Sequence, residues 1–182
     1  MVDEGLPRGI TSIDAGGEVH IHFDGACQPP KGPGVATFGF TIEGGGFDVE
    51  ERGLATRPYS DHSTNNVAEY VAAIRALEWL REHGYRGRVI ASGDSQLVVR
   101  QMTGEYEVRT EHLKAYHDWL ARLAREFAGV EWRWLPRSRN ARADALSKLA
   151  LAENRPVARR LRAAVSEPAD DGSDEGEPDP PD

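Results

Sequence analysis

Val19-His20-Ile21-His22-Phe23-Asp24 is the stretch from which the fold of this chain can be argued. Apolar residues alternate with histidines up to Phe23, a period of two that predicts a β-strand with one face turned toward a core. We expect this strand to end at Asp24, where a loop rich in Gly and Pro begins. A second apolar strand, predicted over 88–92, is followed in the same way by Asp94. If the two strands are parallel neighbours, the two carboxylates lie close together.

The remaining pattern predicts an α/β fold. Strands are expected at 19–23, 35–42, 47–54, 88–92 and 130–135, and helices at 65–82, 95–103, 111–127 and 140–152. The first three strands are separated by short turns, which predicts an antiparallel meander. The order of the elements indicates one mixed sheet of five strands with helices packed on it. Pro156 is expected to interrupt the last helix, and Trp132 and Trp134 are expected to alternate into the core.

The length and charge fit one folded domain followed by an acidic tail. The chain has 182 residues and a net charge of −8, but 8 of its 30 acidic residues lie in 166–182, where there is no Lys or Arg. The other 22 acids equal the 22 Lys and Arg, so residues 1–165 are formally neutral. We expect a flexible leader over 1–17, a folded catalytic domain over 18–154, a basic helical extension over 155–165 and a disordered tail over 166–182. The tail is interpreted either as a solubility element or as a nucleic-acid mimic.

The sequence predicts a cytoplasmic protein without membrane contact. The N-terminal residues lack the apolar core of a signal peptide, and no run approaches the roughly 18 apolar residues of a membrane helix. Cys27 is the only cysteine, which excludes an internal disulfide and favours a reducing compartment.

Four carboxylates are candidates for a metal site: Asp24, Glu69, Asp94 and Asp144. Asp24 and Asp94 follow predicted strands, and Glu69 and Asp144 lie in the first turns of predicted helices. A fold that gathers like charges needs a cation in return, and hard oxygen ligands suit Mg²⁺ or Mn²⁺. The alternative is that each acid is a solvated side chain or one that complements a helix dipole.

Four short motifs contain these acids: Phe23-Asp24-Gly25-Ala26, Thr64-Asn65-Asn66-Val67-Ala68-Glu69, Asp94-Ser95-Gln96-Leu97-Val98 and Pro136-Arg137-Ser138-Arg139-Asn140-Ala141-Arg142-Ala143-Asp144. Each motif is weak alone, but their order, their intervals and the predicted elements that carry them resemble type 1 ribonuclease H over residues 18–152. The resemblance implies an RNase H-like fold with helices on both faces of the sheet. It also implies a metal-dependent endoribonuclease that hydrolyses the RNA strand of RNA–DNA hybrids and leaves 3′-hydroxyl and 5′-phosphate ends.

The resemblance further implies a role for each site residue. The four acids would hold two Mg²⁺ or Mn²⁺ ions and would be catalytic together with Arg137. Asp24 would bridge both ions, and Glu69 would touch the RNA 2′-hydroxyl, the group that distinguishes RNA from DNA. The implied substrate-binding residues are Gly25, Thr64, Asn65, Asn66, Gln96 and Asn140. Thr64 would belong to a pocket for a DNA-strand phosphate, with helix capping as the alternative, and the protein is expected to be a monomer.

The chain departs from the bacterial pattern of this family. No His follows His117, and Arg137 takes the place of a mobile bacterial His, as in archaeal-type members. Arg137 is interpreted either as an electrostatic aid to phosphate exit or as a structural ion pair. The basic handle helix is missing, because residues 102–109 are few and not basic. Two other functions stay open: a non-catalytic module that binds hybrids or double-stranded RNA, and a nuclease that also cuts double-stranded RNA.

Overall fold

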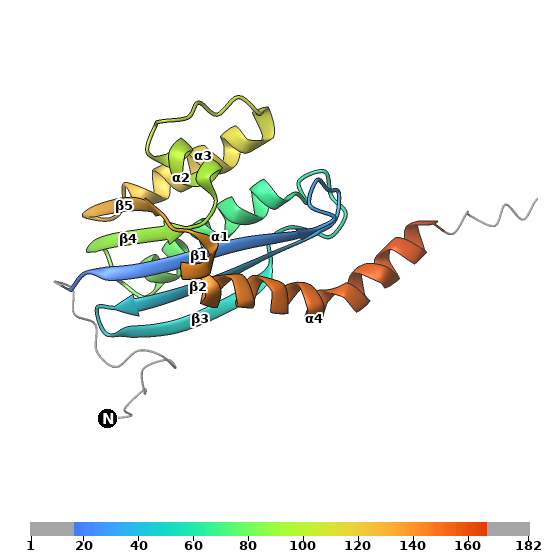
Figure 1. Cartoon of the computed structure of the whole chain (residues 1–182), viewed down its shortest axis with the longest axis horizontal. Coiled ribbons are helices and arrows are strands. Elements are labelled where there is room, and N and C mark those ends of the chain that lie inside the picture. The colour runs from blue at the N-terminus through green and yellow to red at the C-terminus, as the bar shows by residue number, and fades with distance from the viewer. Residues whose placement is uncertain (1–16, 167–182) are drawn as a thin grey trace, which may run out of the picture.

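The computed structural model describes residues 17–166, which form one mixed sheet with helices on both faces (Figure 1). The predicted leader and acidic tail lie outside the described residues, apart from Gly17 and Ser166. The strands are β1 (Val19–Gln28), β2 (Val35–Gly44), β3 (Phe47–Leu54), β4 (Arg88–Gly93) and β5 (Gly129–Trp134). The helices are α1 (Asn65–Glu82), α2 (Gln96–Met102), α3 (Glu111–Ala124) and α4 (Ala141–Ser166), with a short 3₁₀ helix, η1 (Arg137–Arg139).

The sheet has five strands in the order β3-β2-β1-β4-β5. β1, β2 and β3 pair antiparallel, while β4 is parallel to both β1 and β5. The predicted α/β class, the five-stranded mixed sheet and the antiparallel meander are therefore confirmed.

β1 is longer than the sequence predicted. It pairs with β4 only up to Phe23, which lies opposite Gly93. Its pairing with β2 continues to Gln28, which lies opposite Val35. The prediction that the strand ends at Asp24 was wrong because β2 goes on supplying hydrogen-bond partners to the residues that follow. Asp24 nevertheless comes directly after the last residue that pairs with β4.

Two glycines mark where the helices pack most closely on the sheet. A Cβ atom on Gly25 would lie 2.2 Å from the Glu69 nitrogen in α1, and one on Gly39 would lie 2.5 Å from the Ser147 nitrogen in α4. Gly39 is the register partner of Asp24, the neighbour of Gly25. Successive side chains of a strand point to opposite faces, so α1 covers one face of the sheet and α4 covers the other. The α1 backbone thus reaches β1 next to Asp24, and the α4 backbone reaches β2 opposite Asp24.

Two predictions at the C-terminal side are corrected. α4 is one helix through Pro156, because the fixed φ of proline suits a helix and the cost is a local distortion instead of a break. Figure 1 shows the second half of α4 running at an angle to the first half. Trp134 does not enter the core: it is 46% exposed on the edge strand β5, while Trp132 packs partly against the core. Among the described helices, none is long and apolar enough to cross a membrane.

Candidate active site

Three carboxylates meet where the parallel pairing of β1 with β4 ends. Oxygen atoms of Asp24, Glu69 and Asp94 all lie within 4.8 Å of one another. Asp24 is only 3% exposed and Glu69 only 5% exposed. The three acids line a cavity of 530 Å³, together with Asn65 and Arg137. The structure therefore brings together three of the four acids that the sequence singled out.

Glu69 is held in place by the backbone of β1. The Gly25 nitrogen donates a 3.0 Å hydrogen bond to Oε2 of Glu69. This contact requires α1 to lie against the strand, and the absence of a side chain on Gly25 makes that approach possible. Gly25 was predicted to contact substrate; in the structure it lines the cavity and also positions a catalytic candidate.

Asp24 is held by a residue that the sequence interpretation missed. The Ser147 hydroxyl, fully buried in α4, donates a short hydrogen bond to Oδ2 of Asp24. The same hydroxyl oxygen lies 3.0 Å from the backbone oxygen of Asp144. The signal in the sequence was a serine three residues after Asp144, but its meaning depends on how α4 docks on the sheet.

Asp94 is positioned by Asn140 and by β5. Nδ2 of Asn140 donates hydrogen bonds to Oδ1 of Asp94 at 3.3 Å and to the Phe23 oxygen at 2.9 Å. Nε1 of Trp134 donates to the Asp94 backbone oxygen at 3.1 Å. Asn140 was predicted to bind substrate, but its side chain is 1% exposed and turned toward the strands. The structure thus gives Asn140 a contact that positions Asp94 relative to Asp24, and its contact with substrate stays a prediction.

Asp144 lies at the side of the cluster, outside the group of three. Nε of Arg137 donates to Oδ1 of Asp144 at 2.8 Å, and Nζ of Lys148 donates to Oδ2 at 2.7 Å. Burial alone would raise the pKa of Asp144, but the hydrogen bonds from Lys148 and Arg137 outweigh it and lower that pKa. Asp144 is therefore kept ionised by two cationic side chains of the protein, those of Arg137 and Lys148.

The pKa values indicate a surplus of negative charge in the cluster. Burial raises the pKa of Asp24 from 3.8 to about 7; the hydrogen bond from Ser147 opposes this rise, and the charge of Asp94 adds to it. Burial, followed by the charges of Asp24 and Asp94, raises the pKa of Glu69 well above its ordinary value. Buried carboxylates that repel one another in this way are stabilised by a cation among them. The donor set consists of hard oxygen atoms, which fits a divalent ion such as Mg²⁺ or Mn²⁺.

The other predicted substrate contacts lie in or beside the cavity. Oγ1 of Thr64 accepts a 3.4 Å hydrogen bond from the Val67 nitrogen and caps α1, as the capping interpretation expected. Asn65 lines the acidic cavity, whereas Thr64 and Asn66 line a neighbouring cavity of 350 Å³. Gln96 is exposed at the start of α2, just after Asp94. Capping by Thr64 leaves the amide side chains of Asn65 and Asn66 available to a ligand.

Sequence comparisons relate this chain to one protein family and to individual relatives. Residues 22–150 match the protein family described as "Reverse transcriptase-like". Ribonuclease HI of Halobacterium salinarum is 36% identical over 154 residues, which cover 83% of this chain and 74% of the relative. A bifunctional protein of Mycobacterium tuberculosis is 31% identical over 153 residues, and the aligned part of this chain spans 39% of that protein.

Comparison with solved structures shows that the fold of this chain is similar to that of RNase H proteins. RNase H1 from Halobacterium salinarum superposes with a TM-score of 0.65 at 35% identity, covering 75% of this chain and 98% of the other. The N-terminal RNase H domain of the Mycobacterium tuberculosis protein gives a TM-score of 0.67 at 28% identity, covering 80% and 98%. LC11-RNase H1 in complex with an RNA/DNA hybrid gives 0.65 at 33% identity, covering 74% and 97%.

Proposed function

Because this chain belongs to the ribonuclease HI family and is an enzyme of that type, we propose that it hydrolyses the RNA strand of RNA–DNA hybrids with the help of divalent metal ions. The observation that carries the proposal is the cluster of Asp24, Glu69 and Asp94 within 4.8 Å in an open cavity. The hybrid bound to LC11-RNase H1, whose fold is similar to that of this chain, supports the choice of substrate.

The three clustered acids would hold the metal ions, with Asp144 as the fourth ligand. Two Mg²⁺ or Mn²⁺ ions, when bound there, supply an activated water and stabilise the leaving oxygen. Asp24 is the central member, because its raised pKa responds to both Asp94 and Asp144. The ion pairs of Asp144 keep it ionised and therefore ready to act as a ligand.

The remaining residues of the cavity would bind and orient the hybrid. We assign the amides of Asn65, Asn66 and Gln96 to contacts in the minor groove, and Thr64 to a phosphate of the DNA strand. Glu69 is assigned to the RNA 2′-hydroxyl, which gives the choice of RNA over DNA. Water attacks the phosphorus, the P–O3′ bond breaks, and the products carry a 5′-phosphate and a 3′-hydroxyl.

Arg137 is proposed to assist the phosphate from the rim of the cavity. Its guanidinium contacts Asp144, and this contact raises its already high pKa, so it stays charged throughout the reaction. The absence of any His after His117 and the lack of a helix between α2 and α3 support an archaeal-type variant without the bacterial handle. We further propose residues 18–154 as the catalytic domain, since every residue that lines the cavity lies within that range.

A strand-labelled cleavage assay tests the function. RNA·DNA, RNA·RNA and DNA·DNA duplexes of one sequence are incubated with the protein in Mg²⁺ or in Mn²⁺. The expected result is cutting of the RNA strand in the hybrid, with 5′-phosphate ends. Intact RNA in both metals would refute catalysis, and shifted hybrid on a gel under those conditions would instead support a non-catalytic binding module. Equal cutting of RNA·RNA would indicate the broader nuclease.

A further inference from the structure

A hollow of 290 Å³ outside the active-site cavity is not used by the proposed reaction. Its walls come from the loop after β3, from α1 and from α3. The loop contributes Arg57 and His62, and α3 contributes Tyr116 and Trp119. We call it the outer hollow.

The outer hollow adjoins the path that leads away from the acidic cluster. Pro30 lines both the active-site cavity and the cavity of Thr64. His112 of the Thr64 cavity stands edge-on to His62 of the outer hollow, with ring centroids 6.0 Å apart. A nucleic-acid strand that occupies the Thr64 cavity therefore reaches the outer hollow within its next few nucleotides.

The charge of the outer hollow suits a polyanion. Among the described residues that line it there is no carboxylate, whereas Arg57 and Arg75 are both present. Arg57 is exposed and makes no ion pair within the described part of the chain. An unpaired arginine such as Arg57 next to an open path attracts phosphates, and the attraction weakens with salt.

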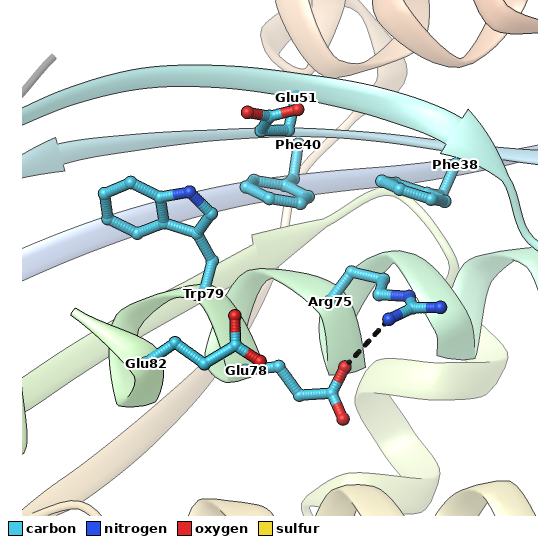
Figure 2. Close-up of a pocket in the computed structure, with 7 residues that line it drawn as sticks. All are labelled: Phe38, Phe40, Glu51, Arg75, Glu78, Trp79 and Glu82. Atoms are coloured by element: carbon cyan, nitrogen blue, oxygen red, sulfur yellow. Dashed lines mark hydrogen bonds and ion pairs between the residues drawn. The ribbon is translucent and has the colours of Figure 1, made fainter. Parts of the chain in front are cut away.

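The groove on the other side of Arg75 has the opposite character (Figure 2). This groove measures 240 Å³ and lies between α1 and the strands β2 and β3, with Glu51, Glu78 and Glu82 around its aromatic rings. Arg75 lines both depressions and pairs with Glu78 at 3.3 Å. The acids of this groove repel the phosphates of nucleic acid. Of the two depressions, only the outer hollow therefore attracts a nucleic-acid strand.

Trp119 offers a flat aromatic surface within the outer hollow. Its side chain is 41% exposed, and Tyr116 lies one helical turn before it in the same lining. Bases inside a duplex cannot reach such a ring, but an unpaired base stacks on it whatever its identity. We propose that the outer hollow binds unpaired nucleotides of the DNA strand that extend beyond the hybrid, with a base on Trp119 and phosphates at Arg57 and His62. This inference rests on the proposed function, because it takes the DNA strand to lie in the Thr64 cavity.

Fluorescence anisotropy with tailed hybrids tests the inference. Three forms of one hybrid duplex are prepared: a blunt form, a form with a 5′ DNA tail and a form with a 3′ DNA tail. Each form is bound to Asp24→Asn protein in Mg²⁺, so that the RNA stays intact. One of the two tailed forms should bind about tenfold more tightly than the blunt form. Trp119→Leu should remove this gain, whereas Trp119→Tyr should keep most of it because an aromatic face remains. Arg57→Gln should reduce the gain, and the control Arg125→Gln, exposed at the end of α3, should leave it unchanged.

Two outcomes would overturn the inference: equal affinity for all three forms, or a gain that persists in folded Trp119→Leu protein. Circular dichroism and thermal unfolding establish that the variants are folded. A gain from an RNA tail of the same length and position, but not from DNA, would also contradict the assignment to the DNA strand. The proposed function fails separately, if wild-type protein leaves blunt hybrid intact in both metals, since the tail effect is measured by binding alone.

Discussion

The Gly25 nitrogen donates a 3.0 Å hydrogen bond to Oε2 of Glu69, which ties a carboxylate of α1 to the strand that carries Asp24. The bond joins residues 44 positions apart and is buried. It exists because the α1 backbone comes within 2.2 Å of where a Cβ of Gly25 would lie, a distance that only glycine permits. The geometry of the acidic cluster therefore depends on how closely α1 packs on β1.

Gly25→Ala is expected to disturb both the fold and the cluster. The added methyl group would overlap backbone atoms of Ala68 and Glu69, so α1 must move away from the strand. Overpacking of this kind costs about 1–3 kcal/mol of unfolding free energy or more. Urea unfolding measures the loss of unfolding free energy. The cleavage rate should fall by more than the loss of folded protein accounts for, because Glu69 shifts away from the other acids. Gly129→Ala is the matched control, since a Cβ there meets nothing within 4 Å; comparable losses in both variants would contradict the account.

Asp24→Asn should abolish cleavage and make the metal-free protein more stable at neutral pH. Folded Asp24 keeps its proton up to about pH 7, whereas the unfolded carboxyl loses it near its ordinary pKa of 3.8. The native state thus binds more protons than the unfolded state between these values, so this group lowers wild-type stability as pH rises through that window.

The pH dependence is measured as a difference between the two proteins. Without metal, the stability advantage of Asp24→Asn should widen from pH 4 to pH 7 by roughly 2–4 kcal/mol. The difference removes contributions from groups that the proteins share. An advantage that stays constant or shrinks across this range would show that Asp24 is not strained by burial and by its neighbours.

Ser147→Ala should weaken metal-dependent activity without breaking the fold. The lost hydroxyl leaves Oδ2 of Asp24 without its buried donor, so the pKa of Asp24 should rise and metal binding should weaken. The expected stability loss is about 1 kcal/mol. Titrating Mg²⁺ should show a higher half-saturating concentration and recovery of rate at high metal. Ser138→Ala, at an exposed position in η1, should leave the metal dependence unchanged.

Arg137→Gln separates the two interpretations of that side chain. Its side chain is 65% exposed, so as a surface ion pair it contributes at most about 1 kcal/mol to stability. If Arg137 also neutralises a substrate phosphate, the cleavage rate of the variant should fall about tenfold. The slope of log affinity against log salt concentration should then correspond to about one phosphate contact fewer. Arg109→Gln, whose side chain is 85% exposed, is the control. Unchanged cleavage in Arg137→Gln would assign Arg137 to the structural ion pair alone.

The strand pattern was sufficient to predict how Asp24 and Asp94 come together. Both follow short apolar strands, and parallel pairing of those strands places them at one level of the sheet. The end of β1 was predicted wrongly because the antiparallel partner β2 extends it, and residues 25–28 themselves carry loop-like composition. Pairing by a neighbour can keep a strand going where local propensity would end it.

The supporting residues of the site were harder to predict than the acids. Asn140 lies in a motif that implies substrate contact, and the structure adds a positioning contact to Phe23 and Asp94 that the motif does not imply. Ser147 belongs to none of the four motifs. Its role arises only because α4 docks on the side of the sheet toward which the Asp24 side chain points. Both roles depend on distances between segments more than 40 positions apart, which periodicity along the chain does not contain.

Asp24, Glu69 and Asp94 are proposed to bind divalent ions together, and titration calorimetry with Mn²⁺ measures that binding. Wild-type protein at neutral pH should bind Mn²⁺ and release protons, because the raised pKa values of Asp24 and Glu69 must fall when the ion enters. Folded Asp94→Asn protein should bind at least tenfold more weakly. Equal Mn²⁺ binding by the two proteins, or none by the wild type, would contradict the account.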